Sequence, residues 1–505
     1  MRSERKVPEM VIIQGREEHI ASFREGESLL AVLQREGFSV NAPCGGKGKC
    51  GRCLVKVVTK GEARRVPACK TPAADGIRLI IEDGNDDLSW NAAGTLAAGK
   101  AGSAPGELGA AVDLGTTSIA VSLFDLSSGQ KLGMRGEWNE QRSHGADVIS
   151  RIGYTMEHAD GLKQLSDTVQ KQILRMIDAL CRENGRKSED LKTVFLAGNT
   201  TMQHLFARIS PESIAAAPFE PQSYFDSPVP FSLPGKEIML TPCVSGYVGG
   251  DIVSGMYALG LDKAEGKHLF LDVGTNGEMA LGGKDGFLTC AVACGPAFEG
   301  AGISCGMPAS AGAISRVWCE GDSLCYEVIG GGEATGLCGS GLLDLAACLT
   351  ELGYISPDGR LFGDEDENGR AVFPLTEHVV LTAGDVRQLQ LAKAAVAAGI
   401  RILLEDSGVS YDEIDTLYLA GGFGTRLNPK SAAALGMLPE ELLGKVRSAG
   451  NASLLGMETA LLSGGERRLL AVRNMCDYTE LSTHSRFSET FVEEMLFPSD
   501  GEWDD

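Results

Sequence analysis

The stretch GAAVDLGTTSIAVSLFD, residues 109–125, decides the fold because its pattern occurs twice in the chain. Residues 268–283, HLFLDVGTNGEMALGG, repeat a buried strand, an aspartate, a Gly-Thr turn and a returning strand. One such turn is weak evidence, since tight hairpins favour Asp, Gly and Thr for local reasons. Two copies in equivalent surroundings predict an internal repeat of the structure.

Both turns carry groups that suit a nucleotide. Each turn offers backbone N–H groups and hydroxyls to phosphate oxygens, and Asp113 and Asp272 end their strands where a hydrated Mg²⁺ could bind. We therefore predict that these two aspartates belong to the catalytic site. The nucleotide contacts expected from the turns are Gly115, Thr116, Thr117, Gly274, Thr275 and Asn276.

A third glycine-rich element follows an apolar strand at 414–429, IDTLYLAGGFGTRLNP. Gly421, Gly422 and Gly424 lack β-carbons, so the backbone there can approach an adenosine closely. We expect this element to complete a nucleotide site.

The three elements together resemble those of a known superfamily. Asp113-Leu-Gly-Thr-Thr, Asp272-Val-Gly-Thr-Asn and Ala420-Gly-Gly-Phe-Gly are similar to the two phosphate motifs and the adenosine motif of actin, the sugar kinases and the seventy-kilodalton chaperones. The resemblance implies two ribonuclease-H-like α/β lobes that close on ATP. An unrelated α/β protein with glycine turns is the ordinary alternative.

One more carboxylate is a candidate for catalysis. Residues 247–261, YVGGDIVSGMYALGL, predict a glycine turn that leads into a helix. In the chaperones a catalytic carboxylate lies at the start of the corresponding helix, so the resemblance makes Asp251 a candidate to orient the attacking water. A helix N-cap is an equally good role for this aspartate. Glu278, just past the second turn, is a weaker candidate for the same catalytic role.

Four cysteines near the start of the chain predict a metal cluster. Residues 42–55, APCGGKGKCGRCLV, contain Cys-x5-Cys-x2-Cys, and a fourth cysteine follows in RVPACKT. The plant-type [2Fe-2S] spacing, Cys-x4-Cys-x2-Cys with a distant fourth ligand, differs by one residue. Structural zinc sites usually use paired Cys-x2-Cys knuckles, so we favour iron-sulfur over zinc or unliganded thiols. The predicted ligands are Cys44, Cys50, Cys53 and Cys69.

The sequence around these cysteines resembles the β-grasp domain of [2Fe-2S] ferredoxins. Alternating or continuous apolar runs predict strands at 10–15, 19–25, 53–61 and 77–84, and a helix at 27–37. The resemblance covers about residues 8–84. Cys69 lies nearer than the fourth cysteine of free plant ferredoxins and is the ligand with the least support.

Residues 85–108, NDDLSWNAAGTLAAGKAGSAPGEL, are small residues, glycine and one proline without periodicity. This composition predicts a flexible linker, with a short helix near 88–98 as the alternative. The expected fold is thus a multidomain α/β and α+β protein. Its parts are a ferredoxin-like domain at 1–84, a linker at 85–108 and a two-lobed ATPase at 109–505, the second lobe starting near 268.

The composition limits the partners and the location. The chain of 505 residues has 46 Lys and Arg against 68 Asp and Glu, a formal net charge of −22, which argues against a nucleic-acid partner. No run of about 18 apolar residues and no signal-peptide core occurs, so no membrane partner is expected. We expect a cytoplasmic protein whose 14 cysteines stay reduced.

The order of the domains resembles the reductive activators of corrinoid proteins. FLAGNTTMQHLF, PCVSGYVGGDI, CGPAFEGAGISCGMPASAGAI and GLCGSGLLDLAA are similar to the body of that family. The resemblance implies a [2Fe-2S] cluster, ATP and Mg²⁺, a corrinoid protein of a methyltransferase system as partner, and an unidentified low-potential electron donor. ATP would drive one-electron reduction of an inactive Co(II) corrinoid to Co(I). We expect no counterpart of the middle domain that some members carry between linker and ATPase, which puts dimerisation through such a domain in doubt and leaves a homodimer undecided.

Two other functions are compatible with the motifs. The protein could activate another low-potential metalloenzyme, as do the activators of 2-hydroxyacyl-CoA dehydratases, which hold a [4Fe-4S] cluster between subunits. It could also be a small-molecule kinase with an appended ferredoxin domain, which would transfer the γ-phosphate to an acceptor.

Two further groups of residues have structural alternatives. Residues 139–152, NEQRSHGADVISRI, offer Asn139, Gln141, His144 and Asp147 as polar site candidates, although a capped helix explains them too. The later cysteines invite a second cluster, but their apolar surroundings favour buried structural thiols. These cysteines are Cys290, Cys294, Cys305, Cys319, Cys325, Cys338 and Cys348.

Overall fold

The computed structural model describes residues 8–14, 17–24, 26–36, 38, 40, 48, 53–59, 62–81, 104–227, 236–321 and 323–498. Of the described residues, those as far as 238 form one compact unit, and those from 239 onward form a second, to which Ser127–Gly129 are also assigned. Among the helices of the described residues, none has the length and apolar character needed to span a bilayer. The predicted linker lies outside the described residues as far as residue 103.

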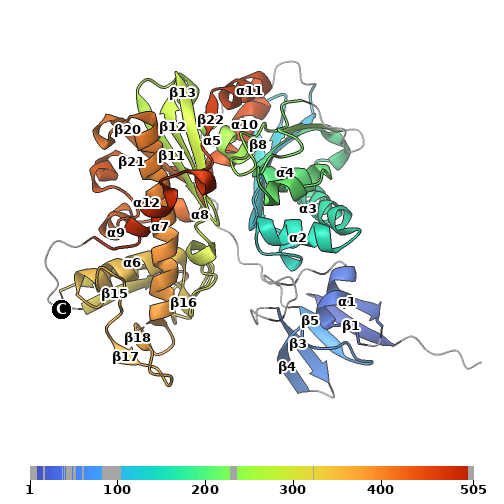
Figure 1. The fold of residues 1–505 in the computed structure, drawn as a ribbon. Coiled ribbons are helices and arrows are strands. Elements are labelled where there is room, and N and C mark those ends of the chain that lie inside the picture. The colour runs from blue at the N-terminus through green and yellow to red at the C-terminus, as the bar shows by residue number, and fades with distance from the viewer. Residues whose placement is uncertain are drawn as a thin grey trace, which may run out of the picture. The chain divides into compact units, whose positions relative to one another are not determined.

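The N-terminal sheet has the β-grasp arrangement (Figure 1). Its five strands lie in the order β2-β1-β5-β3-β4, with β1 parallel to β5 and the β1-β2 and β3-β4 hairpins antiparallel. The elements are β1 (Glu9–Gln14), β2 (Glu17–Ser22), α1 (Leu29–Arg35), β3 (Leu54–Thr59), β4 (Glu62–Pro67) and β5 (Arg78–Ile81). The predicted helix and four strands are confirmed.

Helix α1 shows why the local prediction succeeds. Ser28 caps the helix by accepting a hydrogen bond from the backbone of Ala31 at 3.2 Å. The four apolar residues at helical spacing, Leu29, Leu30, Val32 and Leu33, are all buried. Strand β4, by contrast, was not predicted, because its sequence EARRVP has charged, exposed residues in the middle and lies at the edge of the sheet.

The first lobe is a five-stranded sheet in the order β10-β9-β6-β7-β8. Helix α3 packs against β7 and β8, and α2 and α4 contact α3 (Figure 1). The strands are β6 (Leu108–Leu114), β7 (Ser118–Asp125), β8 (Lys131–Trp138), β9 (Leu191–Gly198) and β10 (Glu237–Leu240). The helices are η1 (Glu140–Ser143), α2 (Val148–Glu157), α3 (Gly161–Glu183), η2 (Ser188–Asp190), α4 (Thr200–Ala207) and η3 (Glu212–Ala215).

The second unit contains a six-stranded sheet in the order β21-β20-β11-β12-β13-β22. Its strands are β11 (Lys267–Val273), β12 (Gly277–Gly283), β13 (Gly286–Val292), β20 (Ile414–Ala420), β21 (Val446–Gly450) and β22 (Cys476–Tyr478). Two small sheets are β15-β14-β16 and β17-β18-β19, built from β14 (Ala313–Glu320), β15 (Ser323–Val328), β16 (Gly336–Leu337), β17 (Asp364–Glu365), β18 (Ala371–Pro374) and β19 (Val380–Thr382).

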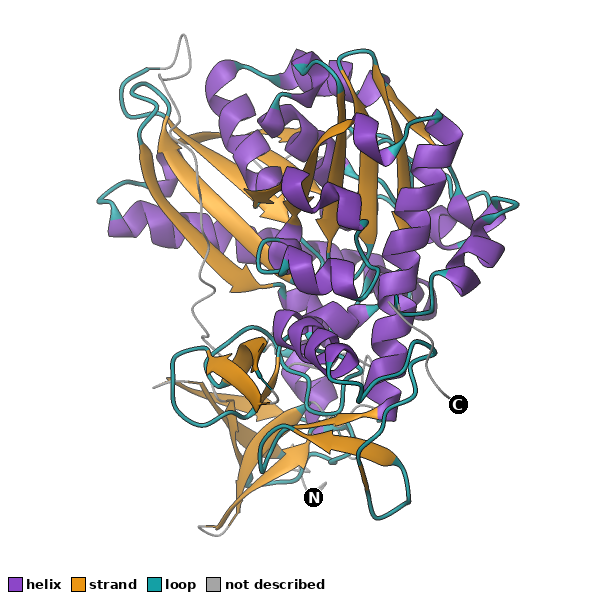
Figure 2. Cartoon of the chain, turned by 90° about the vertical axis from the view of Figure 1, so that its left-hand side faces the viewer, coloured by secondary structure: helices purple, strands orange, loops and turns teal. Residues whose placement is uncertain are grey.

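Helices lie alongside the sheet strands of this unit (Figure 2). The longest, α7 (Ala383–Ser407), packs against β12 and β13. The other α-helices are α5 (Gly250–Leu259), α6 (Gly339–Glu351), α8 (Gly421–Gly424), α9 (Pro429–Ala434), α10 (Ala452–Ser463), α11 (Glu466–Asn474) and α12 (Phe487–Glu493). Short 3-10 turns are η4 (Leu261–Lys263), η5 (Pro296–Glu299), η6 (Tyr411–Glu413), η7 (Glu440–Lys445) and η8 (Leu481–Thr483).

The two large sheets have the same core topology, which confirms the internal repeat. In the first lobe β6, β7 and β8 form an antiparallel meander, and β9 pairs parallel with β6. In the second unit β11, β12 and β13 form the same meander, and β20 pairs parallel with β11. Each quoted hairpin therefore begins a ribonuclease-H-like lobe, as the resemblance implied.

Close packing fixes the helix that carries Asp251. A β-carbon on Gly255 of α5 would lie 2.6 Å from the ring of Phe270 on β11 and 3.3 Å from Ala452 on α10. Helix α5 can sit this close to the sheet and to α10 only because position 255 has no side chain. The start of α5 is thus held firmly in the second unit.

Candidate functional site

The turn between β6 and β7, residues 115–117, is anchored by hydrogen bonds from long polar side chains. Gly115 O accepts a hydrogen bond from Asn139 Nδ2 at 2.9 Å, and Thr116 O accepts one from Arg151 Nη2 at 2.6 Å. Arg151 is completely buried and also donates to Gly145 O at 3.0 Å. These bonds anchor the carbonyls of the turn to side chains from two other segments.

Asn199 fixes the side chain of this turn. It begins helix α4, where its Oδ1 accepts from the backbone N–H of Met202 at 3.0 Å. Its Nδ2 donates to Thr116 Oγ1 at 2.9 Å. Strand β9 approaches closely enough that a β-carbon on Gly198 would lie 2.5 Å from Leu114 O. The stretch FLAGNTT therefore supports the first turn, a role that the sequence did not predict.

The polar stretch at 139–152 caps two helices, and one of its side chains contacts the first turn. Asn139 caps η1 and also contacts the turn, and Asp147 caps α2 in a reciprocal capping box with Ser150. His144 is buried, and burial, reinforced by Arg151 and His158, lowers its pKa to about 4. His144 is therefore a neutral packing residue near pH 7.

In the second unit Asp272 lies beside the adenosine motif. It is the register partner of Ala420 on β20 and of Glu278 on β12. The backbone of Gly421 has a φ of +84°, and a β-carbon there would overlap Asp272 Oδ1. The turn after β11 and the Gly-Gly-Phe-Gly element are thus in direct contact within the second unit.

Carboxylates gather behind this turn. Glu278 is buried, and its pKa is raised well above the usual range, first by burial and then by the nearby charges of Asp251 and Asp272. Gly249, not Asp251, is the N-cap of α5, so the N-cap alternative for Asp251 is wrong. Asp251 is in the first turn of the helix and accepts from the backbone of Ile252 at 2.9 Å.

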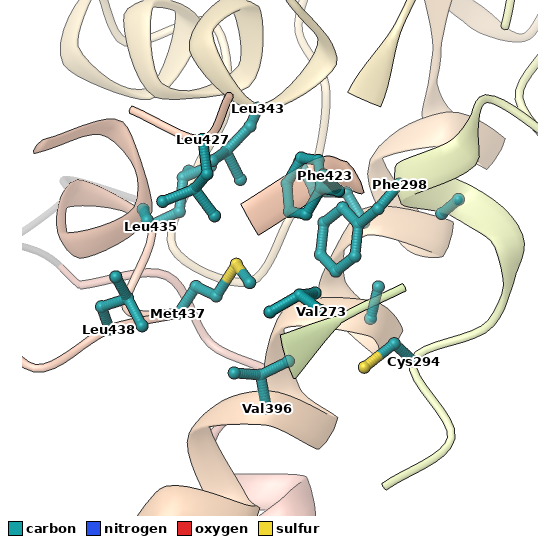
Figure 3. Packing of buried hydrophobic residues seen from close by; sticks show 14 of the residues in the cluster. Val273, Cys294, Phe298, Leu343, Val396, Phe423, Leu427, Leu435, Met437 and Leu438 are labelled. Carbon is teal, nitrogen blue, oxygen red and sulfur yellow. The ribbon is translucent and has the colours of Figure 1, made fainter. Parts of the chain in front are cut away.

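Sequence reasoning missed two residues of this site, both in the stretch GPAFEG. Thr275 Oγ1 donates a hydrogen bond to Glu299 Oε1 at 2.9 Å. Phe298 stacks on Phe423 of the adenosine motif, with ring centroids 4.3 Å apart and planes 8° from parallel (Figure 3). The η5 turn therefore bridges the phosphate turn and α8. Its only sequence signal was a single acid in an irregular glycine-rich segment.

The later cysteines behave as packing residues where they are buried. Cys290, Cys294, Cys338 and Cys348 are all buried, and all but Cys338 belong to the main hydrophobic core of the second unit. Burial raises the pKa of the Cys290 and Cys294 thiols, so neither is a ready thiolate. Cys305, Cys319 and Cys325 are only half-buried. The preference for structural thiols therefore fits the buried four.

The N-terminal domain brings two of the predicted cluster ligands together. Cys53, 1% exposed, immediately precedes β3, and the backbone N–H of Cys69 donates to Cys53 Sγ at 3.4 Å. An N–H aimed at sulfur suits a thiolate ligand, so these residues fit a cluster. Cys44 and Cys50 lie outside the described residues. In the parts of the chain that are described, no three His, Cys, Asp or Glu side chains form a metal-binding group.

Three family models match the chain in succession. The model of the 2Fe-2S iron-sulfur cluster binding domain matches residues 11–74, and that of the RACo middle region matches 108–264. The model described as the C-terminal domain of RACo, the ASKHA domain, matches 266–503. Fold and models together define an ASKHA-type protein, the class of actin and the sugar kinases, joined to a [2Fe-2S] ferredoxin domain.

Relatives that match along most of their length narrow this class. The corrinoid activation enzyme RamQ of Eubacterium limosum is 30% identical over 93% of this chain and 96% of its own. The Co(II) methylated amine-specific corrinoid protein reductase of Methanosarcina barkeri is 25% identical over 78% and 77%. A solved reductive activator for corrinoid, iron-sulfur protein is 31% identical, with a TM-score of 0.70 and coverage of 97% and 98%. The chain belongs to the family of reductive activators of corrinoid proteins.

One expectation about this family needs correction. We expected no counterpart of the family's middle domain, yet the RACo middle-region model matches residues 108–264. Those residues include the whole first lobe from β6 to β10. The first lobe was recognised as part of the ATPase from its hairpin, and the hairpin alone could not show that the family assigns this segment to a separate region.

Proposed function

We propose that this protein uses ATP to drive the one-electron reduction of an inactive Co(II) corrinoid protein, restoring the Co(I) state that accepts methyl groups. The observation that carries the proposal is the relationship to reductive activators over almost the whole chain, with a [2Fe-2S] domain and an ASKHA domain in succession. Activators of the 2-hydroxyacyl-CoA dehydratase type, with a cluster between subunits, are disfavoured because the matched [2Fe-2S] domain lies within this chain.

The nucleotide site uses residues of both repeats. Asp113 and Asp272 act as the carboxylates of a hydrated Mg²⁺, which when bound neutralises charge on the phosphates. In the second unit the charges of Asp251 and Asp272 both act on Glu278, so three carboxylates lie near the place proposed for the ion. Asp251 orients the attacking water. The phosphates bind at Gly115, Thr116, Thr117, Gly274, Thr275 and Asn276, and the adenosine at Gly421, Gly422 and Gly424.

The cluster site uses Cys44, Cys50, Cys53 and Cys69. A bound plant-type [2Fe-2S] cluster supplies a one-electron couple near about −400 mV. If the Co(II) of the partner is harder to reduce than that, the transfer needs a second source of free energy. ATP can provide it only if the ATPase binds the partner differently in its two nucleotide states.

The remaining parts have supporting roles. The linker at 85–108 lets the cluster domain, residues 1–84, approach the cobalt. The tether raises the effective concentration of the cluster at the cobalt. The ATPase, residues 109–505, recognises and remodels the corrinoid protein. A low-potential donor reloads the cluster, and the reaction takes place in the cytoplasm. The proposal also includes a homodimer, and analytical ultracentrifugation can determine whether it forms.

Product accounting tests this function against the kinase alternative. The full-length protein is incubated with ATP and a Co(II) corrinoid protein from the same source, and ADP and inorganic phosphate are both measured. We expect equal amounts of the two products and faster release with the Co(II) form than with the methylated form. ADP without matching inorganic phosphate would show transfer to an acceptor and would contradict the proposal.

A further inference from the structure

We infer that the two phosphate turns, which are alike in sequence, present hydroxyls of opposite hydrogen-bond polarity. Thr116 donates its proton to a phosphate oxygen, whereas Thr275 accepts a hydrogen bond from a water molecule beside the phosphates. Glu299 is the positioning residue that sets the second polarity. This inference rests on the proposed ATP site, and it assigns a role to a residue that no motif identifies.

The polarity of Thr116 follows from the amide of Asn199. In an amide side chain only the oxygen can accept a hydrogen bond from an N–H group. The bond from Met202 N at 3.0 Å therefore shows that Asn199 Oδ1 faces Met202. The NH₂ group must then face Thr116 Oγ1, 2.9 Å away, and donate to it. A hydroxyl that already accepts from an amide keeps its single proton for another acceptor. On this half-buried turn a phosphate oxygen is a suitable acceptor.

The polarity of Thr275 is the reverse. In the 2.9 Å contact between the two side chains, the hydroxyl of Thr275 donates and Glu299 Oε1 accepts. Its one proton is thereby used, and only lone pairs remain for a ligand. A phosphate oxygen also has only lone pairs to offer, so it cannot be the partner of this hydroxyl, and the phosphate contact proposed for Thr275 is made by its backbone N–H. A water molecule can donate to Thr275 and is therefore the expected ligand.

Glu299 is held in place by the packing of its segment. Phe298 stacks on Phe423 at 4.3 Å, and Ala297 is buried. Gly300 follows with a φ of +75°, and a β-carbon there would overlap the backbone of Met307. The carboxylate also lies against the turn itself, since a β-carbon on Gly274 would be 3.8 Å from Glu299 Oε1. Glu299 therefore acts from a fixed position and not as a mobile surface acid.

The negative charge of Glu299 has a second consequence. A carboxylate so near the phosphate turn repels the phosphates of a bound nucleotide, most strongly when no cation is present. The water that Glu299 and Thr275 order is expected to contribute to turnover and so to offset this repulsion. Loss of Glu299 should therefore lower turnover without weakening binding, which is the opposite of what a purely structural residue would do.

The test measures equilibrium binding and turnover separately in the full-length protein. Binding of ADP and of a non-hydrolysable ATP analogue is measured by calorimetry, with Mg²⁺ and with a chelator. Glu299→Ala should lower kcat at least about tenfold and leave the metal-free affinity unchanged or higher. Glu299→Gln keeps an acceptor oxygen and should retain most of the turnover. Glu367→Ala, an exposed glutamate in the β17-β18 turn, is the matched control and should change neither quantity.

The two threonines complete the test and do not depend on the folding of the Glu299 variants. Thr116→Val should weaken metal-free binding about tenfold, whereas Thr275→Val should leave it unchanged. If Thr275 binds a water of Mg²⁺, Thr275→Val weakens binding only when Mg²⁺ is present, and if it binds the attacking water, only kcat falls.

Parallel loss of metal-free affinity in Thr116→Val and Thr275→Val would overturn the inference, as would weaker metal-free binding in Glu299→Ala. Failure of the wild-type protein to bind either nucleotide would instead refute the proposed function, and the inference with it.

Discussion

Asp272, near the end of β11, and Gly421, the first residue of α8, are far apart in the sequence but lie in direct contact in the second unit. A β-carbon on Gly421 would overlap Asp272 Oδ1 and would be 2.8 Å from Val273 O. The parallel pairing of β11 with β20 creates this contact by placing Asp272 opposite Ala420. The same pair of strands thus positions both Asp272 and the Gly-Gly-Phe-Gly element.

This contact predicts a large difference between two neighbouring glycines. Gly421→Ala adds a β-carbon that overlaps the carboxylate, on a backbone whose φ of +84° is unfavourable for alanine. We expect it to lower the free energy of unfolding of the second unit by about 2 to 4 kcal/mol. Gly422→Ala, where a β-carbon meets nothing within 4 Å, is the matched control and should change stability little. Equal thermal stability of the two nucleotide-free variants would contradict the described contact.

The cysteine assignment predicts that the cluster is lost from single variants. Cys50→Ala and Cys53→Ala should abolish the visible absorption and the electron paramagnetic resonance signal of the reduced cluster, because each removes a ligand. Cys69→Ala should do the same if Cys69 is the fourth ligand. Cys325→Ala, a half-buried thiol on β15, is the control and should keep the signal. Normal spectra in Cys53→Ala would reject the assignment.

The aspartates of the two turns predict a selective loss of ATP hydrolysis. Asp113→Asn and Asp272→Asn should each reduce ATPase activity by at least about a hundredfold, because the charge that a Mg²⁺ requires is removed. Iron content should stay normal, since the cluster ligands are in a different domain. Asp285→Asn, exposed in the β12-β13 turn, should leave both properties unchanged. Wild-type ATPase turnover in both Asp113→Asn and Asp272→Asn would show that the repeated hairpins do not bind the nucleotide and its Mg²⁺.

His204, in the helix capped by Asn199, predicts how stability depends on pH. It is fully buried, its Nδ1 bonds to Thr200 O at 2.7 Å, and its Nε2 accepts from Ser223 N at 3.2 Å. The ring is therefore neutral, and burial lowers its pKa to about 4.

Between pH 6.5 and 4 the unfolded chain binds a proton that the folded chain does not, so stability falls as the pH falls through this window. The loss from this group can reach about 3 kcal/mol. In urea unfolding, the wild-type protein should lose more stability from pH 7 to pH 5 than His204→Gln. An equal loss in the two proteins would show that this histidine is not the group responsible.

Local patterns carried the predictions that succeeded. The Asp-x-Gly-Thr turns, the strand before Gly421 and the apolar residues of α1 are each set by neighbours in sequence, so the strings themselves identify them. Strand β4 could not be predicted from its sequence. It lies at the edge of the sheet, and its exposed charged residues show no alternation of apolar and polar side chains.

The supports of the site are contacts between distant segments, and a single sequence does not reveal them. Arg151 reaches Thr116 from another helix, Asn199 reaches it from another strand end, and Glu299 reaches Thr275 from a turn. From the sequence, Glu278 was a weaker candidate than Asp251 for the catalytic carboxylate. The burial that raises the pKa of Glu278 depends on the packing of α5, β11 and β12, which the sequence does not show. Partner side chains of this kind follow from the tertiary structure alone.

The most direct test of the account follows the Co(I) absorption band under anaerobic conditions. The full-length protein with a chemically reduced cluster is mixed with Co(II) corrinoid proteins from the same source, with and without ATP. We predict little Co(I) without ATP and much more with it, and Asp251→Asn should reduce only the ATP-dependent part. Equal yields of Co(I) with and without ATP, for every corrinoid protein tested, would contradict the central claim.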